Sequence, residues 1–326
     1  MGFGAGSKRV ARYILLVIIL ASIPSFLKDD YLLHVMIVTF LFSYLAECWN
    51  WVGGYAGQLS LGHAAFFGIG AYASTLLFLG SGLTPWIGIL IGGSLAAAFA
   101  ALIGGLSLRL RGPFFVLFTI ATAETLRYSF LTFREITKGA YGLLIPTLRN
   151  DPLLFKFLSK EPYYYIVFTM LLISIAVTGI IERSKIGYFL NAIREDQDAA
   201  QSIGIDVTKY KVLALMISAF FTALAGTFYA QYFSYICPDD VMTVALSIEI
   251  ITIAIIGGAG TLWGPVIGGF VLVPISEYLR ITLGGTFAGA HLFIYGAVII
   301  IVIIFAPRGL LGILSDFGRV IMRRSV

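Results

Sequence analysis

Long apolar runs, each separated from the next by a short polar or glycine-rich stretch, dominate the pattern of this 326-residue chain. An α-helix needs about 20 mostly apolar residues to cross a bilayer. Strands of a membrane β-barrel alternate apolar and polar residues, whereas these runs are continuously apolar. The pattern therefore predicts an all-α polytopic membrane protein with about ten spans, near residues 12–28, 31–50, 63–80, 85–108, 113–131, 163–181, 212–232, 242–257, 263–283 and 290–306.

Composition agrees with this prediction. Hydrophobic residues make up 59% of the chain and charged residues 12%, about half the charged fraction of a typical soluble domain. No part of the chain reads as a soluble module, so we expect residues 1–326 to form a single transmembrane domain. Its polar parts are an outer loop at 132–162 with three prolines, a loop at 182–211 and a basic tail at 307–326.

The basic residues predict an orientation, because Lys and Arg accumulate in cytoplasmic loops. Placing the N-terminus inside puts fourteen of the 22 basic residues on the cytoplasmic side and six outside. An even number of spans then leaves both basic termini in the cytoplasm, with the chain crossing the cell membrane many times. The net charge of +5 is accounted for by this asymmetry and calls for no nucleic acid.

Two glycine-rich interruptions break the apolar pattern, at 53–62 and 257–265. Paired Gly/Pro breaks in the two halves of a transporter often mark discontinuous helices beside the pathway; two tight turns fit equally well. Backbone amides and small side chains suit a polar, mobile path for a zwitterion, whereas His63 fits a structural role better than a substrate contact. The candidate translocation-path residues are Gly54, Gly57, Gln58, Ser60, Gly62, His63, Gly257, Gly258 and Gly260.

The 182–211 loop contains an amphipathic segment. Apolar residues recur near a 3.6-residue period over 188–203, with charged residues on the other side. Gly204 is placed to end this helix, and Asp206 or Thr208 to cap the next one. A short helix of this kind docks into a groove on another protein, or lies as a solvated or lipid-surface helix; the pattern alone fits both.

Several charged residues fall within the predicted spans, where a central charge costs about 2.5–3.5 kcal/mol on insertion scales. Glu124 and Arg127 are three residues apart, as are Glu277 and Arg280. Each pair shares one helix face, so we expect the two charges to neutralise each other. Glu249 has no such partner on its own helix and is expected to face another subunit or a wet cavity.

Asp198-Ala199-Ala200-x-x-x-Gly204 resembles the E-A-A-x-x-x-G loop through which ABC importer permeases bind their ATPases, with Asp in place of Glu. The resemblance marks an ATPase-coupling element whose candidate residues are Arg194, Glu195, Asp196, Asp198, Ala199, Ala200 and Gly204.

Five segments together resemble one family, the permease subunits of branched-chain amino-acid ABC importers: 54–63, 111–115, 192–205, 256–265 and 307–310. They occur in the family's order over most of the chain, although the outer-loop run 138–142 departs from it at Tyr141. The resemblance implies a second homologous permease, two ATPases that bind ATP and Mg²⁺, and an extracytoplasmic amino-acid-binding protein, all working with this chain in a lipid bilayer.

The chain itself is expected to be a transport subunit and not an enzyme. It has no Gly-Lys dipeptide and hence no P-loop lysine, and it shows no catalytic constellation, metal-ligand pattern or cofactor motif. Two alternatives stay open: a related ABC permease for urea, amides or sugars, and an ion-coupled secondary transporter that works alone.

Overall fold

The structure is a computed structural model that describes residues 15, 17–24, 29–107, 112–146, 150–283, 296, 297, 300, 304 and 309–312. Within these residues eight helices are long and apolar enough to cross a membrane: Asp30–Tyr55, His63–Ser81, Pro85–Ser107, Pro113–Thr132, Glu161–Arg183, Val207–Phe233, Pro238–Gly258 and Gly264–Thr282. Each coincides with a predicted apolar run, which confirms an all-α polytopic membrane protein. The predicted spans 12–28 and 290–306, and the tail 307–326, lie largely outside the described residues.

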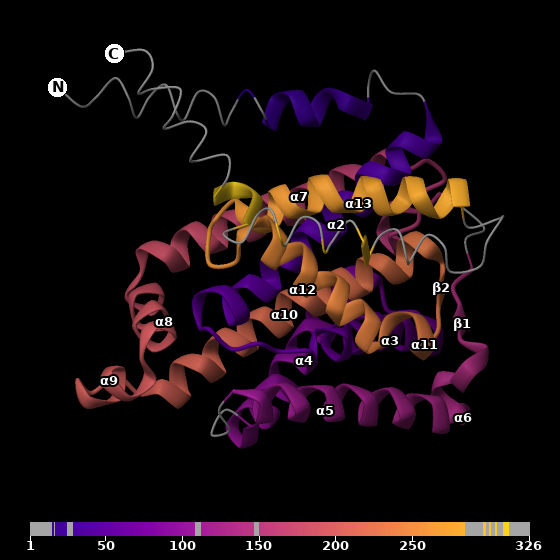
Figure 1. Cartoon of the computed structure of the whole chain (residues 1–326). Coiled ribbons are helices and arrows are strands. Elements are labelled where there is room, and N and C mark those ends of the chain that lie inside the picture. The colour runs from indigo at the N-terminus through magenta and orange to yellow at the C-terminus, as the bar shows by residue number, and fades with distance from the viewer. Residues whose placement is uncertain are drawn as a thin grey trace, which may run out of the picture.

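The long helices (Figure 1) are α2 (Asp30–Asn50), α3 (His63–Ser81), α4 (Pro85–Ser107), α5 (Pro113–Thr132), α7 (Glu161–Arg183), α10 (Val207–Phe233), α12 (Val244–Gly258) and α13 (Gly264–Leu283). The short ones are α6 (Arg134–Thr137), α8 (Lys185–Glu195), α9 (Gln197–Ser202) and α11 (Pro238–Val241). Two short strands, β1 (Leu143–Leu144) and β2 (Tyr235–Ile236), pair antiparallel, with Leu143 opposite Ile236.

Side-chain caps define where several helices begin. The carboxylate of Asp29 accepts a hydrogen bond from the Tyr31 amide at the start of α2. Asp206 caps α10 in the same way, and the Thr243 hydroxyl caps α12. Each cap satisfies a backbone N–H that has no partner within its helix. Of the two predicted caps for α10, the structure selects Asp206.

α10 is the central helix of the bundle, and it packs against α2, α3 and α4. Glycine permits the close crossing with α3: a Cβ on Gly226 would lie 1.9 Å from the Phe67 carbonyl oxygen, and one on Gly70 would lie 2.0 Å from that of Ala223. The Thr227 hydroxyl adds a hydrogen bond of 3.0 Å to the Gly70 carbonyl. Small residues and hydroxyls at crossings are how helices associate in lipid, where the hydrophobic effect gives little help.

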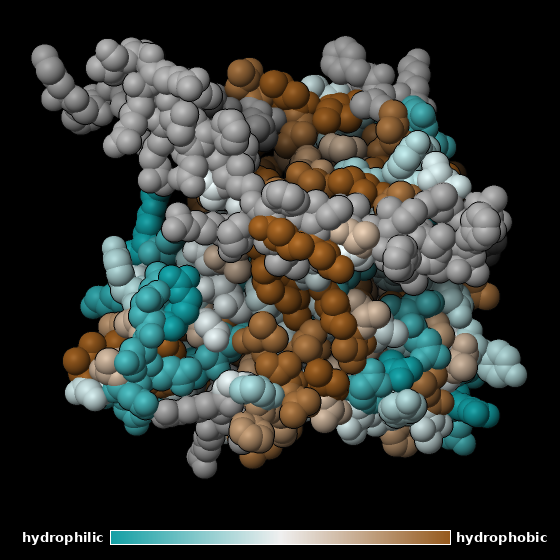
Figure 2. All heavy atoms as spheres, in the orientation of Figure 1, coloured by the Kyte–Doolittle hydropathy of each residue, from teal (hydrophilic) through white to brown (hydrophobic). Residues whose placement is uncertain are grey.

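The two ends of the bundle carry different structures. α8 and α9 lie at one end and the β1–β2 pair at the other, with the long helices running between them (Figure 1). The space-filling view shows apolar surface across the middle of this face and hydrophilic surface toward both ends (Figure 2). Leucines of α4 and α5, such as Leu102 and Leu117, point outward. This arrangement suits a bundle whose sides contact lipid and whose two ends contact water.

The predicted outer loop at 132–162 is structured over the residues described. Trp86 of α4 stacks on Phe155 with ring centroids 4.3 Å apart, and its indole N–H donates to the Pro152 carbonyl at 2.9 Å. Beside them the amine of Lys156 is buried without a hydrogen-bond partner in the described part of the chain. Burial disfavours the charged amine and lowers the pKa of Lys156 to about 8.

Candidate functional site

The first glycine-rich interruption is an ordered turn between α2 and α3. The helix continues past Asn50 as a π-helical turn, Trp51–Tyr55, and the chain then runs irregularly to His63. Gly57 has φ +64°, a left-handed conformation that favours glycine. Two hydrogen bonds stabilise the turn. The Trp49 indole N–H donates to the Ser60 carbonyl at 2.9 Å, and the backbone N–H of Gln58 donates to the Val52 carbonyl at 2.9 Å.

The second interruption is a tight turn between α12 and α13. Gly258 and Gly260 both have positive φ, at +127° and +76°. The Thr261 hydroxyl donates to the Gly258 carbonyl at 2.6 Å and accepts from the Gly264 amide at 3.1 Å. Thr261 thereby satisfies backbone groups at the end of α12 and the start of α13.

Asn50, which is fully buried, joins the two turns. Its side-chain oxygen accepts a hydrogen bond from the Gly260 amide at 2.7 Å, and its side-chain nitrogen donates to the Thr261 carbonyl at 3.0 Å. The backbones are so close that a Cβ on Gly54 would lie 2.3 Å from the Gly260 nitrogen. Two segments about 200 residues apart in the sequence are thus one structural unit.

Arg194, near the end of α8, connects the surface helix to this unit. Its Nη1 donates to the Gly54 carbonyl at 3.0 Å, and its Nη2 lies 3.1 Å from the Glu195 carboxylate. A Cβ on Gly260 would lie 2.5 Å from Arg194 Nη1, and one on Gly57 would lie 2.9 Å from its Cγ. We call Asn50, Gly54, Gly57, Arg194 and Gly260 the Arg194 junction.

The surface segment differs from the continuous helix predicted for 188–204. The chain breaks at Asp196, whose backbone is extended, so that α8 and α9 are separate helices. The Asp196 carboxylate accepts hydrogen bonds from the Asp198 and Ala199 amides at 2.9 and 3.0 Å and caps α9. Aspartate competes with a continuing helix in this way because its short side chain satisfies free amides. The prediction of one continuous helix over 188–204 was therefore wrong.

Part of the apolar stripe of this segment is occupied within the chain. Ile193, Ala200 and Ile205 form a small buried cluster against which Phe189 and Tyr210 pack. Ala199 and Ile203 also fall on the apolar period predicted over 188–203, but both are exposed, Ile203 to 76%. The part of the predicted stripe around Ile203 is therefore open to a partner, and the rest is occupied within the chain.

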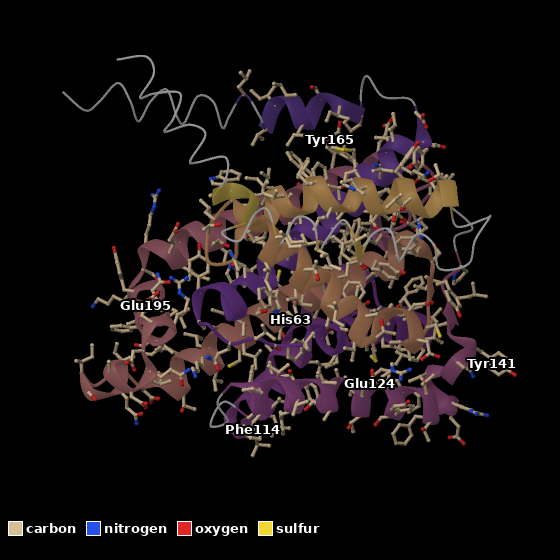
Figure 3. All side chains as sticks on the ribbon, viewed as in Figure 1. His63, Phe114, Glu124, Tyr141, Tyr165 and Glu195 are labelled. Atoms are coloured by element: carbon tan, nitrogen blue, oxygen red, sulfur yellow. The ribbon has the colours of Figure 1, made fainter. Side chains whose placement is uncertain are left out.

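The remaining coupling candidates are on the surface. Glu195 points away from the bundle at the left of Figure 3, and Asp198 is exposed as well. Gly204 has φ +88°, and a Cβ built on it would meet no atom within 4 Å. The positive φ favours glycine at this position. Steric crowding does not, because the surrounding space is open.

His63 lies in the interior of the bundle (Figure 3). Its Nε2 is 2.8 Å from the Ser218 hydroxyl oxygen, and that hydroxyl donates its one proton to the Cys48 carbonyl at 2.7 Å. Nε2 must then be the donor to Ser218, which fixes the tautomer of the neutral ring. Gln58, Ser60 and Gly62, in the turn before His63, are buried as well. Gly257 is buried where α12 meets α13, and a Cβ on it would lie 1.9 Å from the Gly264 carbonyl oxygen.

The charged pairs of the spans have partners at short range. Arg127 Nη2 lies 2.7 Å from the Glu124 carboxylate on α5 (Figure 3), and Arg280 Nη2 lies 2.7 Å from that of Glu277 on α13. Arg127 also reaches Asp239 at the start of α11, with 2.5 Å between Nη1 and Oδ1. The contact with Asp239 could not be predicted from the spacing of residues within one helix, because Asp239 is far from α5 along the chain.

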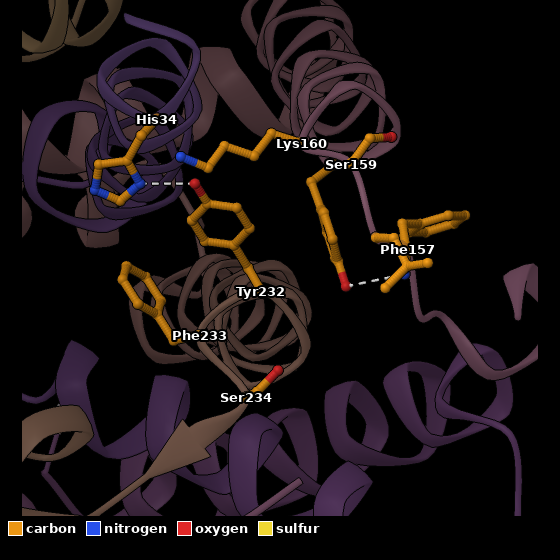
Figure 4. A pocket seen from close by; sticks show the side chains of 9 residues that line it. His34, Phe157, Ser159, Lys160, Tyr232, Phe233 and Ser234 are labelled. Atoms are coloured by element: carbon orange, nitrogen blue, oxygen red, sulfur yellow. Dashed lines mark hydrogen bonds between the residues drawn. The ribbon is translucent and has the colours of Figure 1, made fainter. Parts of the chain in front are cut away.

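An aromatic pocket of about 330 Å³ lies near the N-terminal end of α2 and the C-terminal end of α10 (Figure 4). His34 Nδ1 is 2.6 Å from the Tyr232 hydroxyl, and the Lys160 amine donates to the Asp30 carbonyl at 2.8 Å. This aromatic pocket lies at the end of the bundle opposite the Arg194 junction.

Comparison with known proteins places the chain in a family. Residues 31–303 match the family described as branched-chain amino acid transport system / permease component. The chain is 28% identical over 321 residues to the high-affinity branched-chain amino acid transport system permease protein LivM of Escherichia coli, covering 92% of this chain and 74% of that protein. It is 24% identical over 288 residues to LivH of Salmonella typhimurium, covering 83% and 91%.

A remote likeness exists to the solved structure titled PsaBC from Streptococcus pneumoniae in complex with Fab, with a TM-score of 0.45 and 17% identity over 89% of this chain and 95% of that one. The sequence match extends across most of the chain and includes both glycine-rich turns and the α8–α9 segment. The chain therefore belongs to the family of permease components of branched-chain amino acid transport systems.

Proposed function

We propose that this chain is the membrane permease subunit of an ABC importer for branched-chain amino acids. Family membership and the LivM and LivH relatives support this substrate class. Because both kinds of permease are similar to this chain, a second homologous permease completes the path. ATP and Mg²⁺ bind to two partner ATPases, since this chain has no P-loop lysine. An extracytoplasmic binding protein delivers the amino acid.

The Arg194 junction is the observation that carries this proposal. α8 and α9 lie at one end of the apolar bundle, where the surface is largely hydrophilic and a soluble subunit has access to them (Figures 1 and 2). Arg194 binds the turn between α2 and α3 and lies against the turn between α12 and α13. A displacement of α8 is therefore transmitted to the ends of four membrane helices, α2, α3, α12 and α13. The transmission runs through the Arg194 side chain and the two Asn50 hydrogen bonds.

This linkage gives a mechanism for driving the spans. Closure of the ATPases shifts α8–α9, and the shift moves both glycine-rich turns together because Asn50 ties one to the other. Coupling of this kind needs a contiguous set of contacts with two arrangements. On this proposal the α8–α9 end is cytoplasmic, as the distribution of basic residues also favours, and both termini lie on that side.

Import of L-leucine by the complete complex tests the proposed function. We expect proteoliposomes containing this chain, its partner permease, the ATPases and the binding protein to accumulate L-leucine only when ATP is supplied to the ATPases. Ionophores that collapse proton and sodium gradients should not lower the uptake. Uptake without ATP would instead identify a secondary transporter, and ATP-driven uptake of urea, an amide or a sugar but not leucine would change the substrate class.

Ile203 supplies a test of where the ATPases dock. It is an apolar side chain, 76% exposed, at the end of α9. We expect Ile203→Asp to lower co-purification of the ATPases by about tenfold, because a buried interface contact of this size is worth roughly 1.5–3 kcal/mol.

Tyr141→Asp is the matched control for Ile203→Asp. Tyr141 is an exposed aromatic residue at the opposite end of the bundle (Figure 3), and its replacement should leave ATPase binding unchanged. Equal ATPase recovery with the Ile203 and Tyr141 variants would show that α9 is a free surface helix.

A further inference from the structure

A cleft of about 550 Å³ lies between α2, α10, α12 and α13, and α2 packs against each of the other three helices. This volume is within the usual range of about 300–1,000 Å³ for small-molecule sites. The cleft reaches from Asp239 and Asp240, at the start of α11, to Thr252 in the second half of α12. It therefore begins near the β1–β2 end of the bundle and extends toward the Arg194 junction.

The charges along the cleft are not equivalent. Asp239 is paired with Arg127, and Glu277 with Arg280. The carboxylates of Asp240, which is exposed at one end of the cleft, and of Glu249 make no hydrogen bond or ion pair within the residues that the structure describes. Of these two, only Glu249 lies inside the bundle, where Glu277 and Arg280 act on it electrostatically. It lies near the middle of the span Pro238–Gly258. An unpaired carboxylate at that depth is costly and is retained where it faces a cavity or a ligand.

The rest of the lining complements an amino acid. Leu41, Leu45 and Phe67 form an apolar wall suited to a branched aliphatic side chain. Thr252 and Ser276 add hydroxyls that hydrogen-bond either to a ligand or to water. Arg280 donates to Glu277 through Nη2, and the remaining N–H groups of its guanidinium are suited to a carboxylate.

We propose that this cleft is a transient substrate site in which Glu249 binds the ammonium group of the amino acid. The apolar wall takes the side chain, and Arg280 attracts the α-carboxylate from the mouth of the cleft. The inference rests on the proposed function and adds to it a place and an anchoring residue. A carboxylate selects for the ammonium group, which distinguishes an amino acid from a sugar, urea or an amide.

Replacement of Glu249 in the complete complex tests this site. In proteoliposomes we expect Glu249→Gln to lower the initial rate of ATP-driven L-leucine uptake by at least about tenfold, because glutamine keeps the shape but loses the charge that binds the ammonium. Glu249→Asp should retain more uptake than Glu249→Gln. Co-purification of the second permease and the ATPases, and ATP hydrolysis without binding protein, should stay at wild-type levels.

Glu135→Gln is the control for loss of a carboxylate, because Glu135 is exposed in the outer loop. Leucine uptake by Glu249→Gln equal to that of Glu135→Gln would overturn the inference while leaving the proposed function standing. Loss of the second permease from the Glu249→Gln complex would also overturn it, since Glu249 would then pair with that subunit. A wild-type complex that imports no leucine would overturn both proposals together.

Discussion

Replacing Gly260 by valine is expected to abolish leucine import while the chain still inserts and binds its partners. Gly260 has φ +76°, where a β-branched residue is strained by about 1–2 kcal/mol or more. Its Cβ would also lie 2.9 Å from the Gly54 carbonyl oxygen and 2.5 Å from Arg194 Nη1. The carbonyl belongs to the backbone, so the two turns must separate to make room, and the Gly54–Arg194 hydrogen bond is lost with them.

Gly82→Val separates backbone strain from this crowding. Gly82 also has positive φ, at +67°, but a Cβ on it would meet no atom within 4 Å. We expect Gly82→Val to lower the thermal stability of the complex slightly and to keep import near the wild-type rate. Import by Gly260→Val at the rate of Gly82→Val would show that close contact between the two turns is dispensable.

The spans were predictable because lipid imposes a simple requirement on sequence. With no water in the membrane core, a crossing segment must satisfy its backbone internally and expose apolar side chains. Each described span therefore appears in the sequence as an apolar run, and only short features differ. The predicted span 242–257 is shorter than the observed span Pro238–Gly258, because α11 comes first and a brief break at 242–243 separates it from α12.

The Arg194 junction shows what one sequence cannot supply. Arg194 and the glycines were each singled out as candidates, but as parts of two different sites. Their meeting depends on the packing of α2 against α12 and α13 and of α8 against the first turn. Asn50 was not singled out at all, although an asparagine at the end of an apolar run and directly before a glycine-rich turn is a usable signal.

The break at Asp196 was missed for a local reason. The 3.6-residue apolar period continues across it, so the pattern predicted one helix. The carboxylate instead satisfies two free amides of a new helix, and this preference of aspartate for N-terminal positions outweighed the period. The ion pair between Arg127 and Asp239 could not be predicted either, because it joins α5 to α11 and residue spacing indicates only contacts within one helix.

Removal of the Arg194 side chain should uncouple ATP hydrolysis from transport. Arg194→Ala deletes the hydrogen bond to Gly54 and the side chain that lies against Gly260, while Asn50 still holds the two turns together. The ATPases then remain docked on α8–α9 but no longer move the turns. A charged hydrogen bond of this kind is worth about 1.5–3 kcal/mol when buried and less here, where Arg194 is partly exposed, so we expect a loss of coupling of about tenfold.

Arg194→Lys and Arg183→Ala complete the comparison. Lysine keeps the charge but not the planar fork that reaches Gly54 and Glu195 at once, so we expect an intermediate result. The side chain of Arg183, at the end of α7, makes no hydrogen bond or ion pair within the described residues, and its removal should leave coupling intact.

The number of leucine molecules imported per ATP hydrolysed, measured on the same proteoliposomes, tests most directly whether the Arg194 junction transmits the work of the ATPases. The account predicts that Arg194→Ala lowers this ratio about tenfold while hydrolysis continues and ATPase recovery stays at the wild-type level, and that Arg183→Ala leaves it unchanged. A wild-type ratio in Arg194→Ala would contradict it.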